Sequence, residues 1–234
     1  MPDHSPAVRP VVRRRSDLAW FAGASLVLAG CSVAIDGNSV AAFEESVFRA
    51  ANDVPGAIYP VLWPVMQFGT FISVPLVAIG ALALKRIRLA IEASAAGVSA
   101  YFLAKVVKDM FPRDRPGAFL EDVQLQGIGT GGRGYPSGHA AVSASLAFVL
   151  WAYLPRRWRW VPVAAAGVVS FGRMFVGGHL ALDVVGGAAL GIACGAVATF
   201  LGGVPDRNAA RPAPAEAAAR DPGPADPAAG EAAG

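Results

Sequence analysis

The sequence predicts an all-α membrane protein whose helices cross the bilayer as a bundle. Of its 234 residues, 54% are hydrophobic and only 16% are charged, whereas soluble domains carry about 25% charged residues. The charges gather in short clusters and near the chain ends, which leaves long apolar stretches between them. Each stretch is close to the ~20 residues that a helix needs to span the hydrocarbon core. The net charge of +3 is small and scattered, which disfavours nucleic acid as a partner.

Six apolar stretches separate the charged clusters, and each is expected to form one transmembrane helix. The second stretch contains Pro64 and Pro75, which membrane helices tolerate as kinks. The third has Glu92 and Lys105 near its two ends, where long side chains reach the membrane interface. The expected fold is therefore a six-helix transmembrane bundle. Its helices are expected to cover residues 18–35, 58–84, 89–107, 137–154, 160–176 and 180–204.

The six-helix domain is expected to cover residues 18–204, between two polar tails. Residues 1–17 form a basic N-terminal tail. Residues 205–234 are rich in Ala and Pro and contain no large apolar side chain. Such a segment cannot bury enough apolar surface to order itself, so we expect a disordered C-terminal tail.

The two cysteines, Cys31 and Cys194, lie inside apolar stretches and are interpreted as small buried hydrophobic residues. Cys31 has an alternative interpretation, because residues 28–31 (Leu-Ala-Gly-Cys) resemble a bacterial lipoprotein cleavage site. The apolar run continues to Ile35, which favours an intact first helix.

Three basic clusters fall on the same side of the membrane if the chain crosses it at every apolar stretch. They lie within residues 13–15, 85–88 and 156–159. Because basic loops are enriched on the cytoplasmic side, both termini are expected to be cytoplasmic, in the plasma membrane of a bacterial-type cell. A second group of cations then lies at the extracytoplasmic face, where the orientation of the chain does not explain it. This group includes Lys105, Lys108, Arg113, Arg115 and Arg173.

Three short segments at this extracytoplasmic face concentrate the ionisable residues: 108–116, 136–139 and 173–183. Taken singly, their residues have ordinary structural explanations. Lys108 and Arg115 suit the membrane interface, Ser137 suits a helix N-cap, and Asp183 suits the first turn of a helix. The two histidines of these segments can also be interfacial. Those explanations leave open why so many ionisable groups gather at one face, so we interpret the set as an active site.

A phosphate group would account for the cations. Its oxygens are negatively charged hydrogen-bond acceptors, and arginine offers a fork of donors to such oxygens. The hydroxyl of Ser137 and the backbone N–H of Gly138, at a helix N-terminus, would add oriented donors. The candidate phosphate ligands are Lys108, Arg115, Ser137, Gly138 and Arg173.

Two histidines and one carboxylate supply the candidate catalytic groups. His179 and Asp183 are four residues apart and would share a face if the last helix begins near His179. The carboxylate could then hold one ring nitrogen while the other attacks phosphorus. His139 would act as the general acid for the leaving oxygen.

The three segments resemble the signature of the type 2 phosphatidic acid phosphatase family, which is related to the vanadium haloperoxidases. The family pattern is Lys, six residues, Arg-Pro; then Pro-Ser-Gly-His; then Ser-Arg, five residues, His, three residues, Asp. The first two parts match completely, and the third matches at Arg173, His179 and Asp183. The chain departs from the pattern at Gly172, where the family has serine. A soluble haloperoxidase is disfavoured by the apolar stretches.

The resemblance implies a lipid phosphatase in which His179 forms a phosphohistidine, Asp183 orients His179 and His139 protonates the leaving group. It implies no metal and no cofactor, and a lipid phosphate or diphosphate, either polyprenyl or phosphatidyl, as substrate among the membrane lipids. A non-catalytic protein that binds or transports lipid phosphates is the alternative. The glycine-rich connection at residues 117–134 either shapes the site or serves as a mobile spacer.

Overall fold

The computed structural model describes residues 10–206, which include all three motif segments. Residues 1–9 and 207–234 lie outside the described part, so most of both expected tails does too. Three short 3₁₀ turns, η1 (Gly56–Ile58), η2 (Gln67–Gly69) and η3 (Pro116–Ala118), and two short strands, β1 (Val11–Val12) and β2 (Val204–Pro205), accompany the helices. The α-helices of the described residues are α1 (Arg15–Ala34), α2 (Ala42–Asn52), α3 (Tyr59–Met66), α4 (Ser73–Ala83), α5 (Ile87–Met110), α6 (Gly138–Tyr153), α7 (Trp160–Phe175) and α8 (Ala181–Gly202).

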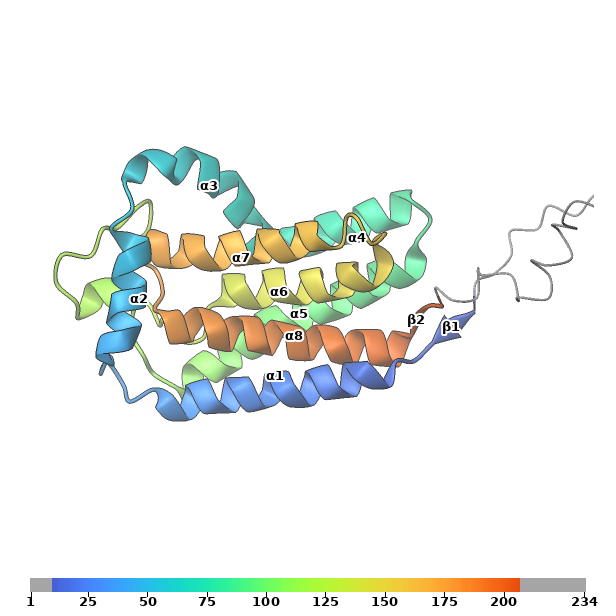
Figure 1. Cartoon of the computed structure of the whole chain (residues 1–234), viewed down its shortest axis with the longest axis horizontal. Coiled ribbons are helices and arrows are strands. Elements are labelled where there is room, and N and C mark those ends of the chain that lie inside the picture. Colours follow the sequence, from blue (N-terminus) through green and yellow to red (C-terminus); the bar gives the residue numbers. More distant parts are fainter. Residues whose placement is uncertain (1–9, 207–234) are drawn as a thin grey trace, which may run out of the picture. The chain divides into compact units, whose positions relative to one another are not determined.

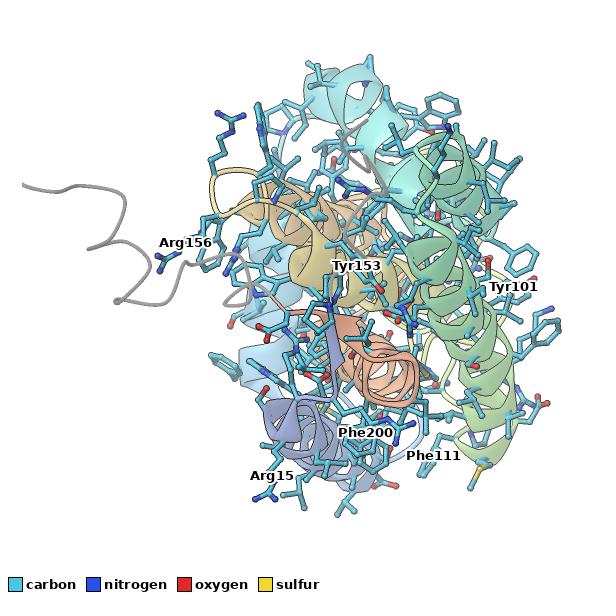
Figure 2. All side chains as sticks on the ribbon, turned by 90° about the vertical axis from the view of Figure 1, so that its right-hand side faces the viewer. Arg15, Tyr101, Phe111, Tyr153, Arg156 and Phe200 are labelled. Atoms are coloured by element: carbon cyan, nitrogen blue, oxygen red, sulfur yellow. The ribbon has the colours of Figure 1, made fainter. Side chains whose placement is uncertain are left out.

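Helix α8 lies at the centre of the bundle and contacts α6, α1 and α5 (Figure 2). Its glycines at successive turns make this close approach possible. A Cβ atom on Gly187 would clash with the Ser137 carbonyl, and one on Gly191 would clash with the Ala141 carbonyl. Small residues at i and i+4 are a common way for membrane helices to pack backbone against backbone. The start of α6, which carries part of the second motif, is thereby held against α8.

Small side chains line the inside of the bundle, and large apolar side chains cover its outside. On α5 the buried positions include Ala93, Ala96 and Ala100. In contrast, Leu26 on α1 is 73% exposed, and Ile79 on α4 is 62% exposed. Water would make such a surface unfavourable, whereas lipid would not. This distribution is that of a multi-pass membrane protein.

The apolar helices follow the order of the predicted spans but differ from them in length. Among the described helices, α1, α5 and α8 are long and apolar enough to cross a membrane. The segments 56–69 and 73–83 qualify together as a bent pair. Helices α6 and α7 are apolar but have only 16 residues each. The number of six spans therefore stays a prediction.

The predicted helix at residues 58–84 is not continuous. The chain bends by 72° at the break between Gly69 and Ser73. Pro75 gives the physical reason, because proline has no N–H to donate and its ring opposes a helical turn before it. In α4 Pro75 occupies the third position, where the N–H needs no helical partner. Helix α4 therefore starts just before Pro75, and this proline favours a break from α3, although α3 itself continues through Pro64.

Helix α2 was not predicted, because its sequence reads only as a polar segment between two apolar stretches. Its buried residues, Glu44, Phe48, Ala51 and Asn52, recur at a spacing of three to four and form one face. The charged Glu44 and polar Asn52 on this face obscure the pattern that apolar residues alone would give. In Figure 1, α2 lies across the end of the bundle where α7 ends and α8 begins.

The connections at the two ends of the bundle differ in character. The start of α1 and the α4–α5 and α6–α7 connections lie at one end, whereas α2, the connection after α5 and the α7–α8 turn lie at the other (Figure 1). Arg15 and Arg156, labelled in Figure 2, belong to the first end. The three basic clusters therefore share one end, and the three motif segments share the opposite end.

Candidate active site

The α7–α8 turn places His179 immediately before the last helix. Helix α7 ends at Phe175, and Gly177 follows with φ +74°, a left-handed conformation that glycine adopts without strain. The backbone N–H groups of Gly178 and His179 then donate to the Arg173 carbonyl at 3.0 and 3.2 Å. This turn buries His179, whose exposed fraction is 3%. His179 therefore lies outside α8, so it does not share a helical face with Asp183 as expected. The two side chains instead approach each other at the start of the helix.

Both oxygens of Asp183 are held in place. Asp183 is the third residue of α8, and its Oδ2 accepts the backbone N–H of Leu180 at 2.8 Å. The same oxygen lies 3.7 Å from Nδ1 of His179, slightly longer than a hydrogen bond. Oδ1 accepts from Nη1 of Arg113 at 3.2 Å. The carboxylate is fully buried and faces the histidine.

The second motif forms the N-terminus of α6. Ser137 is the N-cap residue, and its hydroxyl accepts the Ala140 N–H at 3.5 Å. Its own N–H donates to the Asp183 carbonyl at 2.8 Å, which joins the starts of α6 and α8. A Cβ atom on Gly138 would meet nothing within 4 Å, so the backbone there faces open space. His139 is half-buried and lies within electrostatic range of His179 and of the three predicted cations.

Within residues 10–206, three of the predicted site residues are cations without an ion pair: Lys108, Arg115 and Arg173. The ion pairs in this part of the chain all involve other basic residues. Lys108 Nζ donates only to backbone carbonyls, those of Arg133 at 3.0 Å and Gly134 at 3.1 Å. The Nε atoms of Arg115 and Arg173 are buried without a hydrogen-bond partner in the described part of the chain. Arg173 is buried, whereas Lys108 and Arg115 are partly exposed, and Arg115 also donates Nη1 to the Gly129 carbonyl at 3.2 Å. Sheltered cations that lack a carboxylate partner favour a bound anion. The structure thus brings all the predicted site residues to one place.

The site keeps His179 uncharged. Burial lowers the pKa of His179 well below the ordinary value for histidine, and the charges of Arg173, Lys108 and Arg115 lower this pKa further. An imidazole with a lowered pKa is neutral at neutral pH and has a free lone pair. This is the protonation state that a nucleophile needs.

The connection at residues 117–134 is held by α2. Asn52, which is fully buried, donates to the carbonyls of Gln124 and Phe175 at 2.9 Å each, and its Oδ1 accepts the Gln124 N–H at 2.9 Å. Arg49 donates to the carbonyl of Glu121 at 2.9 Å. Of the two interpretations of this connection, the structure supports a segment fixed beside the site over a free spacer.

Replacing Asn52 by alanine should loosen this connection. Each buried backbone group left without a partner costs about 1–3 kcal/mol, so proteolysis within residues 117–134 should become faster and the thermal midpoint lower. Asn38→Ala is the matched control, because Asn38 likewise accepts a backbone N–H, that of Asp114, and donates to the Asp114 carboxylate, but is exposed to solvent. Water can replace those bonds, so Asn38→Ala should behave like the wild type. Equal protease sensitivity of the two variants would contradict the assigned role of Asn52.

The departure from the family pattern at Gly172 has a structural explanation. A Cβ atom on Gly172 would lie 2.6 Å from Sδ and 2.8 Å from Cγ of Met66, which is buried on α3. Met66 therefore fills the volume that the family serine would need. The glycine and the methionine form a matched pair beneath Arg173.

Restoring the family serine alone should therefore be harmful. Overpacking of this kind costs about 1–3 kcal/mol, so Gly172→Ser should lower the thermal midpoint and the activity. The loss should be smaller in a Met66→Ala background, where the serine has room. Gly167→Ser on the same helix is the control, since a Cβ there would meet nothing within 4 Å. A Gly172→Ser effect of the same size in both backgrounds would refute the pairing with Met66.

Two residues of the site were missed from the sequence as functional candidates. Arg113 was noted only as one of several cations, and Glu44 only as part of a polar segment. In the structure the two side chains form a buried ion pair, with Arg113 Nη2 2.6 Å from Glu44 Oε2. The burial of Arg113 could have been suspected from its place within the first motif. Glu44 carries no comparable signal, because it is remote from the motifs in sequence.

A separate cavity lies towards the opposite end of the bundle, where its lining includes the start of α1 and the start of α7, and it is not the phosphate site. It has a volume of about 530 Å³, lies among α1, α6, α7 and α8, and is lined mainly by apolar residues such as Trp20, Phe148 and Trp151. None of the predicted site residues lines it. Within residues 10–206, no group of three or more His, Cys, Asp or Glu side chains is placed to hold a metal ion.

Comparison with known proteins gives one family and three relatives. Residues 89–202 match the PAP2 superfamily. Undecaprenyl-diphosphatase of Sulfolobus acidocaldarius is 35% identical over 95 residues, which are 40% of this chain and 46% of that protein. This chain thus covers about half the length of that curated relative.

Two solved structures share the fold. LpxE of Aquifex aeolicus is 25% identical with a TM-score of 0.59, over 70% of this chain and 98% of that chain. A transmembrane PAP2-type phosphatidylglycerolphosphate phosphatase from Bacillus subtilis is 20% identical with a TM-score of 0.63, over 80% and 96% of the two chains. The matched region at residues 89–202 contains every residue predicted for the site, and this part of the chain is a PAP2 superfamily sequence.

Proposed function

We propose that the protein is a membrane phosphatase that hydrolyses a lipid phosphate or diphosphate through a phosphohistidine intermediate. The observation that carries the proposal is a group of three cations that have no carboxylate partner within residues 10–206 and that surround the buried, uncharged His179. A phosphate group has the negative charge and the acceptor oxygens that these cations lack. The family match supports the same chemistry, as do the two relatives that are named a diphosphatase and a phosphatase.

In the first step, Nε2 of His179 attacks phosphorus, because Nδ1 faces Asp183. The N–P bond forms while the bond between phosphorus and the leaving oxygen breaks. His139 takes up a proton once the bound phosphate offsets the charges of the surrounding cations, and it gives that proton to the leaving oxygen. The negative charge of Asp183 stabilises the positive charge that develops on the imidazole ring.

In the second step, water attacks phosphorus, and His139 takes the proton that the water loses. The N–P bond breaks, inorganic phosphate leaves, and His179 returns to its neutral form. Lys108, Arg115 and Arg173, with the N-terminus of α6 at Ser137 and Gly138, hold the phosphoryl oxygens through both steps. Preorganised donors of this kind are usually the largest single contribution to such catalysis.

The proposed substrate is a polyprenyl diphosphate or a phosphatidyl-type lipid phosphate. The names of two relatives point to these two classes. The site lies at the end of the bundle opposite to the basic clusters, so we place it at the extracytoplasmic face, with both termini cytoplasmic. At that boundary the headgroup can reach the cations while its hydrocarbon chains remain in the bilayer.

The alternative, a protein that binds or transports lipid phosphates without hydrolysis, explains the cations equally well. It does not explain why a buried carboxylate lies 3.7 Å behind an uncharged histidine, because binding alone does not require a positioned nucleophile.

The test is phosphate release from a panel of a polyprenyl diphosphate, a polyprenyl phosphate, phosphatidic acid and phosphatidylglycerol phosphate in detergent micelles. Wild type should release phosphate from at least one of them, with or without EDTA, and His179→Ala should not. The control variant His4→Ala removes the histidine that lies outside the three motifs. Binding of a panel lipid without any release by the wild type would favour the alternative. Equal release by wild type and His179→Ala would exclude the mechanism.

A further inference from the structure

Arg113 is the largest fully buried side chain of the described residues, with an exposed fraction of 1%. Its Nη1 donates to Glu44 Oε1 at 2.9 Å, and its Nη2 donates to Glu44 Oε2 at 2.6 Å. This is the forked geometry that makes an Arg–carboxylate pair directional. Nη1 also donates to Asp183 Oδ1 at 3.2 Å. Arg113 therefore lies between two carboxylates, of which only one faces His179.

Glu44 holds more than the arginine. Its Oε1 also accepts the backbone N–H of Leu182, in the first turn of α8, at 3.0 Å. Asp183 Oδ2 accepts the N–H of Leu180 in the same turn. One carboxylate from α2 and one from α8 thus fix the backbone on both sides of the helix start. This arrangement sets the position of Asp183 relative to His179.

The charges of the group are also arranged for His179. Arg113 stays charged: burial lowers its pKa, but the hydrogen bonds to Glu44 and the charges of Asp183 and Glu44 raise it more, and the net pKa is raised. If Asp183 were its only partner, the guanidinium would neutralise the carboxylate that must stabilise a positive imidazole. With Glu44 present, two carboxylates share one cation, and one negative charge remains beside the histidine.

We propose that Glu44 and Arg113 are positioning residues that fix the carboxylate of Asp183 and preserve its negative charge for His179. The proposal rests on the proposed function, since it concerns the same phosphoryl transfer. Neither residue contacts the phosphate ligands Lys108, Arg115 and Arg173 in any described hydrogen bond or ion pair. Their removal should therefore affect the chemical step and not the binding of phosphate.

The principal variant is Glu44→Gln, which keeps the shape and removes the charge. Loss of such a supporting partner typically lowers activity about 10–100-fold, so kcat on the best panel lipid should fall by this factor. KM and the Kd for inorganic phosphate, measured by calorimetry on the solubilised protein, should stay within about twofold of wild type, because the three cations remain. Glu44→Asp, which keeps the charge, should recover part of kcat. Glu45→Gln is the matched control, since the one ion pair of Glu45 within residues 10–206 is with Arg49.

Several outcomes distinguish positioning from a purely structural role. Activities are compared per folded protein from size-exclusion chromatography, and Arg113→Lys replaces Glu44→Gln if the latter does not fold. A kcat equal to that of wild type in the folded variant overturns the inference but leaves the proposed function intact. A parallel loss of kcat and phosphate affinity also overturns it, because the whole site would then have collapsed. A wild type without activity on any panel lipid overturns the proposed function and this inference together.

Discussion

The His179→Ala variant should hydrolyse the lipid substrate at least about 10⁴-fold more slowly than wild type, because loss of a covalent nucleophile removes the reaction path itself. The cations and the α6 N-terminus remain in this variant, so inorganic phosphate should still bind. Rapid quenching of wild type during turnover of ³²P-labelled lipid should trap an acid-labile, base-stable phosphoprotein. The same quench of His179→Ala should yield none.

The pH dependence gives a second readout on the same residue. Since the pKa of His179 is lowered from 6.5, the ring is unprotonated above its lowered pKa and stays neutral as the pH falls through 6.5. The acid limb of kcat/KM, after correction for ionisation of the substrate, should therefore lie below pH 6.5. A limb at pH 6.5 or above would mean that His179 titrates as an ordinary exposed histidine. His4→Ala should reproduce the wild-type profile.

The His139→Ala variant should lose about 10²–10⁴-fold in activity towards alkyl phosphates, because the leaving alkoxide then departs without a proton. The loss should be much smaller for p-nitrophenyl phosphate, whose leaving group is acidic and needs no proton. It should be intermediate for a polyprenyl diphosphate, from which a phosphate monoester leaves. This dependence on the leaving group is specific to a general acid. A uniform loss across the three substrates would show that His139 binds or positions the substrate instead.

His179→Ala provides the contrast for this series. It should lose activity towards all three substrates, because every one of them must transfer its phosphoryl group to the same nitrogen. The roles of the two histidines can thus be distinguished by the substrates on which each variant loses activity, and not only by the size of the loss.

The places of the motif residues in the fold follow from their spacing, because that spacing is fixed by local geometry. Ser137 and Gly138 begin a helix, and His179 and Asp183 flank the start of another, so short segments define where these side chains can lie. The apolar stretches likewise predicted where the long helices run. Pro64 and Pro75 indicated kinks in the second stretch, but not the 72° bend before Pro75, since hydropathy does not distinguish a sharply bent segment from a nearly straight helix.

The supporting part of the site was beyond sequence reasoning for a different reason. Glu44 reaches Arg113 across 69 positions in the chain, and such contacts depend on how the helices pack. Its neighbours on α2 give no warning, because a buried acid on a short helix resembles a surface acid when seen in sequence. The same holds for Gly172, which stands where the family has serine. The sequence indicated a missing hydroxyl, but only the packing showed that Met66 fills the volume of the serine side chain.

Helix α2 has a practical consequence for engineering substrate specificity. Its side chains reach the first motif through Glu44, the connection after α5 through Arg49 and Asn52, and the start of α8 through Glu44 again. Any chimera that exchanges residues 117–134 with those of a relative would separate this connection from the helix that recognises its backbone. We therefore expect functional grafts between PAP2 proteins to require α2 and the connection as one transplanted unit, although residues 53–116, 64 in number, lie between the two in the chain.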